Sequence, residues 1–127
     1  MTDIKNHVVS LEIAKQLKEA GWKKETEFDF VEHKSILSSG YEECRLLIPA
    51  TSVSLYPEEY WNYYPAPLAT EILEELPEKI SLCAFYAKSE YRAVDNDVHR
   101  NASTQVSHNP CNALASMWLY LKKKKLI

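Results

Sequence analysis

The chain has 127 residues, of which 46% are hydrophobic and 26% are charged, and its formal net charge is -3. This composition predicts one globular domain over residues 1–127, with 1–7 loose, and excludes an intrinsically disordered chain. The mild negative charge argues against a dedicated duplex-binding protein, so a nucleic-acid partner is not expected. The sequence contains neither the apolar core of a secretory signal nor a run of about 20 apolar residues. We therefore expect a cytoplasmic protein without a membrane partner.

The glycine and cysteine contents limit which cofactors the protein could bind and indicate the state of its thiols. Only two glycines occur, Gly21 and Gly40, whereas a phosphate-cradling loop needs several. Nucleotide cofactors of the Rossmann and P-loop kinds are therefore excluded, and no cofactor is expected. The three cysteines, Cys44, Cys83 and Cys111, are widely spaced. In a cytoplasmic protein they are expected to be reduced thiols, mostly buried.

The first elements are predicted from apolar spacing. Ser10 is the expected N-cap of a helix over 11–20, and Gly21 ends it in a left-handed conformation. Trp22 is expected to fold back onto the core. A short strand follows at 28–31, with both phenylalanines on one face.

The next part of the chain is predicted to be less regular. A second short strand covers 44–48 and ends at Pro49, and 50–55 adds an irregular strand. Residues 56–67 read YPEEYWNYYPAP, and the three prolines predict a loop or extended arm. Pro67 is expected to open a second helix, which ends at Pro77.

A long strand is predicted from Ile80 to Ala87, because apolar residues occupy both of its faces. It is expected to continue to Val94 and then to form a hairpin with residues 98–106.

The register of that hairpin follows from charge. A three-residue loop would oppose Arg92 and Arg100, and like charges directly opposed destabilise a sheet. A two-residue loop of Asn96 and Asp97 instead places Arg92 opposite Asn101. We therefore predict the two-residue loop.

The last helix, residues 109–121, is the most apolar segment. Asn109 and Pro110 are typical of a helix start, and Lys122–Lys125 follow its end. Leu114, Met117, Trp118 and Leu121 share one face, which places Trp118 in the middle of the core. The predicted fold class is α+β, with three amphipathic helices packed on a small, mostly antiparallel sheet.

The best candidate for function is the aromatic arm. Tyr60, Trp61, Tyr63 and Tyr64 are the residue types that dominate protein–protein hot spots, because they are large and stiff and carry a polar tip. They predict a surface that binds another macromolecule, most simply a protein. The alternative interpretation is that they cover one edge of the core. No catalytic residue is predicted.

Two alternative functions remain. On a strand, Asp95, Asp97 and His99 would share one face and could hold a divalent metal in an enzyme, although a solvated turn has the same composition. Lys122–Lys125 could bind nucleic acid weakly, or could simply complement the negative end of the last helix.

Cysteine chemistry is a weaker possibility. Cys111 could pair with His108 as nucleophile and base, or join His99 and His108 as a zinc ligand. The dipole of the last helix is expected to lower the pKa of the thiol. A buried structural cysteine is the simpler interpretation, and no metal ligand is assigned.

Three segments resemble a known family: VVSLEIAKQLKEAGW, YYPAPLATEILEELP and NALASMWLYLKKKKLI. In this order they are similar to a family of small, uncharacterised bacteriophage and prophage proteins from low-GC Gram-positive and Bacteroides-like hosts. The resemblance covers under half of the chain, mainly its helices. It implies a phage-encoded protein inside the host cell, and it carries no activity or catalytic motif.

Overall fold

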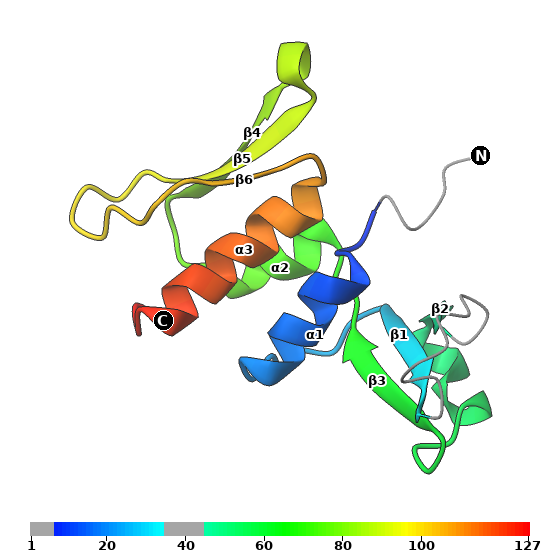
Figure 1. Cartoon of the computed structure of the whole chain (residues 1–127). Coiled ribbons are helices and arrows are strands. Elements are labelled where there is room, and N and C mark those ends of the chain that lie inside the picture. Colours follow the sequence, from blue (N-terminus) through cyan, green and yellow to red (C-terminus); the bar gives the residue numbers. More distant parts are fainter. Residues whose placement is uncertain (1–6, 35–44) are drawn as a thin grey trace.

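The computed structural model describes residues 7–34 and 45–127 (Figure 1). Helices pack against two three-stranded antiparallel sheets, which confirms the α+β class. The first sheet has the strand order β2-β1-β3, and the second sheet has the strand order β4-β5-β6. The elements are α1 (Leu11–Glu19), β1 (Phe28–His33), β2 (Arg45–Pro49), η4 (Ala50–Leu55), β3 (Trp61–Pro65), α2 (Ala69–Glu75), β4 (Ile80–Phe85), η5 (Tyr86–Lys88), β5 (Glu90–Asp95), β6 (Gln105–Ser107) and α3 (Pro110–Lys123). The predicted single sheet is thus two sheets.

The prediction that residues 1–7 are loose and the prediction that Cys44 is a buried thiol fall wholly or mainly on residues 1–6 and 35–44, outside the described residues.

Helix α3 is the centre of the core. It lies against the second sheet, while α1 lies between α3 and the first sheet (Figure 1). The four predicted core residues, Leu114, Met117, Trp118 and Leu121, are all buried. The Trp118 indole meets Trp22 edge to face at a centroid distance of 5.1 Å. The expectation that Trp22 folds back onto the core is confirmed.

Asn109 ties the start of α3 to the start of the chain. Its side-chain oxygen accepts hydrogen bonds from the amides of Cys111, at 2.7 Å, and Asn112, at 3.2 Å. Its amide nitrogen donates to the carbonyl of buried Val8 at 2.9 Å. One side chain thus caps a helix and anchors a segment about a hundred residues away.

Replacement of Asn109 separates these two roles. We expect Asn109→Ala to lower the free energy of unfolding by about 2 kcal/mol, because both the cap and the bond to Val8 are lost. Asn109→Ser keeps an oxygen that can cap the helix, so it should be less destabilised. Urea unfolding followed by circular dichroism measures both variants, and an equal loss in the two would contradict the dual role.

Helix α1 has the predicted ends and is joined to the first sheet by charge. The Ser10 hydroxyl accepts from the amide of Ile13, and Gly21 adopts a φ of 94°. The Glu32 carboxylate, only 6% exposed, receives the Lys15 ammonium at 3.2 Å and the Arg45 guanidinium at 2.9 Å. A buried carboxylate needs such partners, and here they join α1, β1 and β2.

Two predictions for residues 50–67 were wrong. Residues 50–55 form a 3-10 helix, and Trp61–Pro65 form a strand that pairs with β1. Pro57 and Pro67 lie outside this strand, and Pro65 is its last residue. Pro65 lies opposite Asp29, while the next amide, of Ala66, donates to Phe28. The missing N–H of Pro65 therefore faces away from β1, where it costs no ladder hydrogen bond.

The predicted long strand from Ile80 towards Val94 was also wrong. The chain reverses through η5 and Ser89, which has a φ of 52°, so β4 and β5 form a hairpin of their own. Ile80 pairs with Asp95 and Phe85 with Glu90. Ser89 is the only common turn residue in the reversal, which contains no glycine, proline, asparagine or aspartate.

The predicted register of the following hairpin was wrong as well. Arg92 pairs with Val106, not with Asn101, and residues 96–104 form a wide loop. The cause is the Asp95 carboxylate, which accepts from the Arg100 side chain and the Ala102 amide. These bonds hold the loop in place of a tight turn.

Candidate functional site

The strand β3 separates the four predicted aromatic residues. Side chains alternate along a strand, so Trp61 and Tyr63 lie on one face of the first sheet and Tyr64 on the other. Tyr60 precedes the strand and is 56% exposed. The four side chains therefore do not form one patch.

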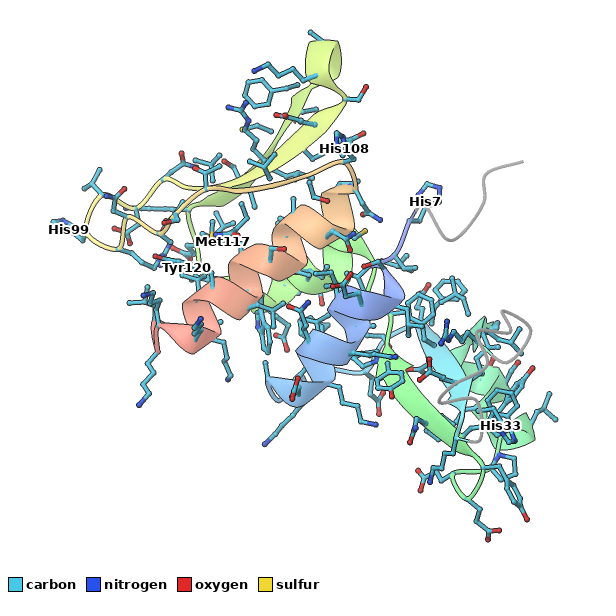
Figure 2. The ribbon with its side chains drawn as sticks, in the orientation of Figure 1. His7, His33, His99, His108, Met117 and Tyr120 are labelled. Carbon is cyan, nitrogen blue, oxygen red and sulfur yellow. The ribbon has the colours of Figure 1, made fainter. Side chains whose placement is uncertain are left out.

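A half-buried aromatic cluster nevertheless forms where β3 begins. The Trp61 ring lies edge to face against His33, at 4.9 Å, and against Tyr56, at 5.0 Å. Tyr60 is adjacent in sequence to Trp61, and Leu55, adjacent to Tyr56, is 74% exposed. We call Leu55, Tyr56, Tyr60 and Trp61, together with His33, the aromatic tip; His33 is labelled in Figure 2.

Sequence reasoning missed part of this cluster. His33 is the last residue of β1 and Leu55 is the last residue of η4, so neither belongs to the aromatic stretch of residues 56–67. The antiparallel register brings His33 opposite Trp61, and the path of the chain after η4 brings Tyr56 against the same indole. Only knowledge of the strand pairing could have identified these neighbours.

The other two aromatic residues have structural contacts. The Tyr63 hydroxyl donates to the Tyr56 carbonyl and fastens the end of η4 to β3. Tyr64 packs against the main core, with the Lys18 ammonium 4.9 Å from its ring centroid and that of Lys15 at 5.5 Å. For Tyr64 the alternative interpretation, an aromatic side chain that covers the core, fits its surroundings.

A groove of about 690 Å³ runs beside Tyr63. Val53 and Pro65 supply apolar surface, and Asp29 supplies a half-buried carboxyl. Burial raises the pKa of Asp29, and a hydrogen bond from the Thr26 hydroxyl partly opposes this. Tyr63 lines the groove and its hydroxyl donates to the Tyr56 carbonyl, so this one side chain connects the groove to the aromatic tip.

The proposed metal face does not form. Residues 96–104 are not a strand, so Asp95, Asp97 and His99 do not share a strand face. Both Asp95 oxygens accept from Arg100, at 2.7 and 2.8 Å, and Asp97 accepts from the His99 amide. Among the residues that the structure describes, no group of three or more His, Cys, Asp or Glu is arranged to hold a metal ion.

Cys111 has the environment of a structural thiol. It is 1% exposed, and its sulfur lies 3.1 Å from the His7 carbonyl. Burial raises the pKa of Cys111 to about 11, so the predicted lowering by the helix dipole was wrong. The His108 Nδ1 lies 2.7 Å from the Ser89 carbonyl. His33, His99 and His108 lie in different parts of the molecule (Figure 2).

The C-terminal lysines are exposed at the end of α3. Lys122 lies over the Trp118 ring at 5.5 Å, and Lys124 lies 6.0 Å from the centroid of Tyr120. The amides of Lys124 and Lys125 donate to the last carbonyls of the helix. These contacts close α3, and no second basic element accompanies them in the sequence.

Comparison of the chain with protein-family models, with curated proteins and with solved structures finds no match in any of the three. Within the described residues, no helix is both long enough and apolar enough to cross a bilayer. The structure is that of an α+β protein with two small antiparallel sheets and with the aromatic tip where β3 of one sheet begins.

Proposed function

We propose that this protein is a non-enzymatic accessory protein that binds another protein through the aromatic tip. The observation that carries the proposal is the exposure of Tyr60 and Leu55, each next in sequence to a ring of the cluster that Trp61 forms with His33 and Tyr56. Tyr and Trp are enriched at the centres of protein interfaces, where burial of their large rings contributes most of the affinity.

The arrangement of Trp61 supports this choice over the rest of the aromatic stretch. Its edge-to-face contacts with His33 and Tyr56 restrict the side chain before any partner arrives. Ordering a free side chain at an interface costs about 0.5–1.5 kcal/mol, so a restricted anchor loses less on binding. Tyr63 and Tyr64 contribute by fixing the sheet beneath the tip.

The setting of this interaction rests on the resemblance of the helical segments. We propose that the protein is encoded by a phage or prophage and acts in the host cytoplasm. Its partner would then be a host or phage protein carrying a small apolar pocket for the Tyr60 ring. Exposed large apolar side chains that gather at one place are a recognised mark of an interaction site.

The test uses substitutions that leave the buried core untouched. Leu55→Ser with Tyr60→Ser removes the two exposed side chains of the tip, and Val98→Ser with Val106→Ser is the matched control. Val98 and Val106 are 82% and 52% exposed and belong to the second-sheet half of the chain. Tagged wild type and both double variants are used to capture proteins from nuclease-treated lysates of infected or lysogenic bacteria.

We expect wild type and the control to retain the same polypeptide and the tip variant to lose it, with all three melting at similar temperatures. Titration calorimetry with the purified polypeptide should then show affinity weakened at least roughly tenfold by the tip variant. A partner retained equally by the tip variant, or lost on nuclease treatment, would refute the proposal.

A further inference from the structure

The edge strands β3 and β4 differ in how far they are protected from pairing with another chain. On the β3 edge, the Trp61 amide donates to the Pro57 carbonyl at 3.0 Å. The Tyr63 carbonyl accepts from the Lys18 ammonium at 2.8 Å, and Pro65 has no N–H to offer. Lysine and proline are common means of preventing an edge strand from pairing with another chain. This edge is therefore protected.

The β4 edge lacks these devices. Its six residues, ISLCAF, include no charged residue and no proline. The Asn96 amide donates to the Lys79 carbonyl. Because every second residue of an antiparallel strand bonds to the neighbouring strand, this bond shows which residues of β4 bond to β5. The main-chain groups of Ile80, Leu82 and Ala84 consequently point away from β5. Within the described part of the chain, no strand pairs with them.

The position of β4 makes this edge accessible. The β4–β5 hairpin extends past α3, away from the helices (Figure 1). Ala84 is exposed, and Phe85 is 41% exposed with its ring 4.0 Å from the Arg92 guanidinium. An uncharged edge that projects from the body is a template for strand addition.

We propose that β4 pairs antiparallel with β4 of a second copy of this chain, about a two-fold axis at Leu82. Leu82 then faces Leu82 of the second copy, and Ile80 faces its Ala84. Each of these pairs exchanges both of its N–H to C=O hydrogen bonds. The two sheets become one continuous sheet across the axis, an isologous contact typical of two-fold dimers.

The sequence of β4 favours its own copy as the occupant. In this register apolar residues oppose apolar residues, and Cys83 opposes Ser81. Lys79, just before the strand, opposes Phe85, so no like charges meet. An axis at Cys83 would instead form fewer hydrogen-bonded pairs, because η5 begins after Phe85. The proposal is independent of the aromatic tip, which lies on the other sheet.

Proline at residue 84 tests the edge directly. Ala84→Pro removes an outward N–H without removing a donor to β5, and Ala84→Ser keeps that N–H at the same exposed site. We expect sedimentation to give twice the monomer mass for wild type and Ala84→Ser. Ala84→Pro should weaken the dimer by roughly tenfold or more. A monomeric wild type, or an unchanged dimer in a folded Ala84→Pro variant, would overturn the proposal.

A disulfide cross-link tests the proposed register between the two copies of β4. It also tests the dimer itself if Ala84→Pro fails to fold. Ser81→Cys, made together with Cys44→Ser, places the introduced thiol directly opposite Cys83 of the second copy. Within one chain the side chains of positions 81 and 83 project in parallel from the same face, with Cβ atoms about 6.6 Å apart, whereas a disulfide needs Cβ atoms about 4 Å apart, so a disulfide inside one chain is disfavoured.

Oxidised glutathione should therefore yield a covalent dimer of the Ser81→Cys variant. Peptide mass spectrometry should show that its disulfide joins the introduced thiol to Cys83, and Cys44→Ser alone should give no such dimer. Absence of that link, or a disulfide between the two copies of Cys83, overturns the proposed register.

Discussion

Trp118→Ala should lower the free energy of unfolding by about 4 kcal/mol, the largest effect expected from one substitution in this chain. The indole is 6% exposed and lies where α3 meets Trp22. Truncation to alanine removes its buried area and leaves a cavity that the surrounding helices cannot fully close. The edge-to-face contact with Trp22 is lost as well. Urea unfolding followed by far-UV circular dichroism measures the change.

Lys123→Ala is the control for this substitution. Lys123 lies on the same helix but is exposed, so its removal should change the free energy of unfolding by at most about 0.5 kcal/mol. Near-UV circular dichroism should also show that Trp22 loses its fixed environment only in Trp118→Ala. A loss below about 1 kcal/mol for Trp118→Ala would show that α3 is not the centre of the core.

The second large effect is expected at Asp95, whose side chain is 0% exposed. Its carboxylate receives two hydrogen bonds from Arg100, which is itself only 15% exposed, and one from the Ala102 amide. Asp95→Asn should cost about 3 kcal/mol, because the buried pair is broken and only the Asp97 carboxylate, 3.7 Å away, still faces the Arg100 cation. Thermal melting at neutral pH measures this loss.

Arg100→Met provides the matched comparison. The double variant Asp95→Asn with Arg100→Met should be less destabilised than the sum of the two single variants, because the buried pair is removed as a whole and the Asp97 carboxylate left behind is partly exposed. Additive losses would contradict a direct ion pair between the two side chains.

The same pair predicts how stability depends on pH. The hydrogen bonds from Arg100, with smaller contributions from the amides of Asp97 and Ala102, lower the pKa of Asp95 from 3.8 to about 2. The folded state therefore holds the proton more weakly than the unfolded state does. The stabilisation is complete above pH 3.8 and is lost as the pH falls towards 2. The stability difference between wild type and Asp95→Asn should shrink over this interval, and a constant difference would contradict the shift.

The helices were predictable because their signals are local. The caps at Ser10 and Asn109 lie within three residues of the amides that they bind. The apolar spacing of Leu114, Met117 and Trp118 repeats with the helical turn, so their common burial follows from sequence alone. The same reasoning ended α1 at Gly21, where a positive φ is easily adopted.

For the candidate site, the sequence predicted the types of residue but not their positions in the structure. The sequence identified Tyr60 and Trp61 as residue types suited to binding, but not that Tyr64 turns to the opposite face. Exposure of Tyr60 and the contact of Trp61 with His33 both depend on the pairing of β1 with β3. No residue within the aromatic stretch signals that pairing.

What the sequence alone determined is therefore the α+β class, the three helices and the residues of α3 that form the core, since these depend on contacts between near neighbours. Only the tertiary structure decided that the strands divide into two sheets, that the chain reverses at Ser89, and that Arg100 holds the loop after β5. Strand partners are chosen by hydrogen bonds and side-chain contacts between residues distant in the chain. The local sequence pattern of a strand therefore does not predict which strand it pairs with.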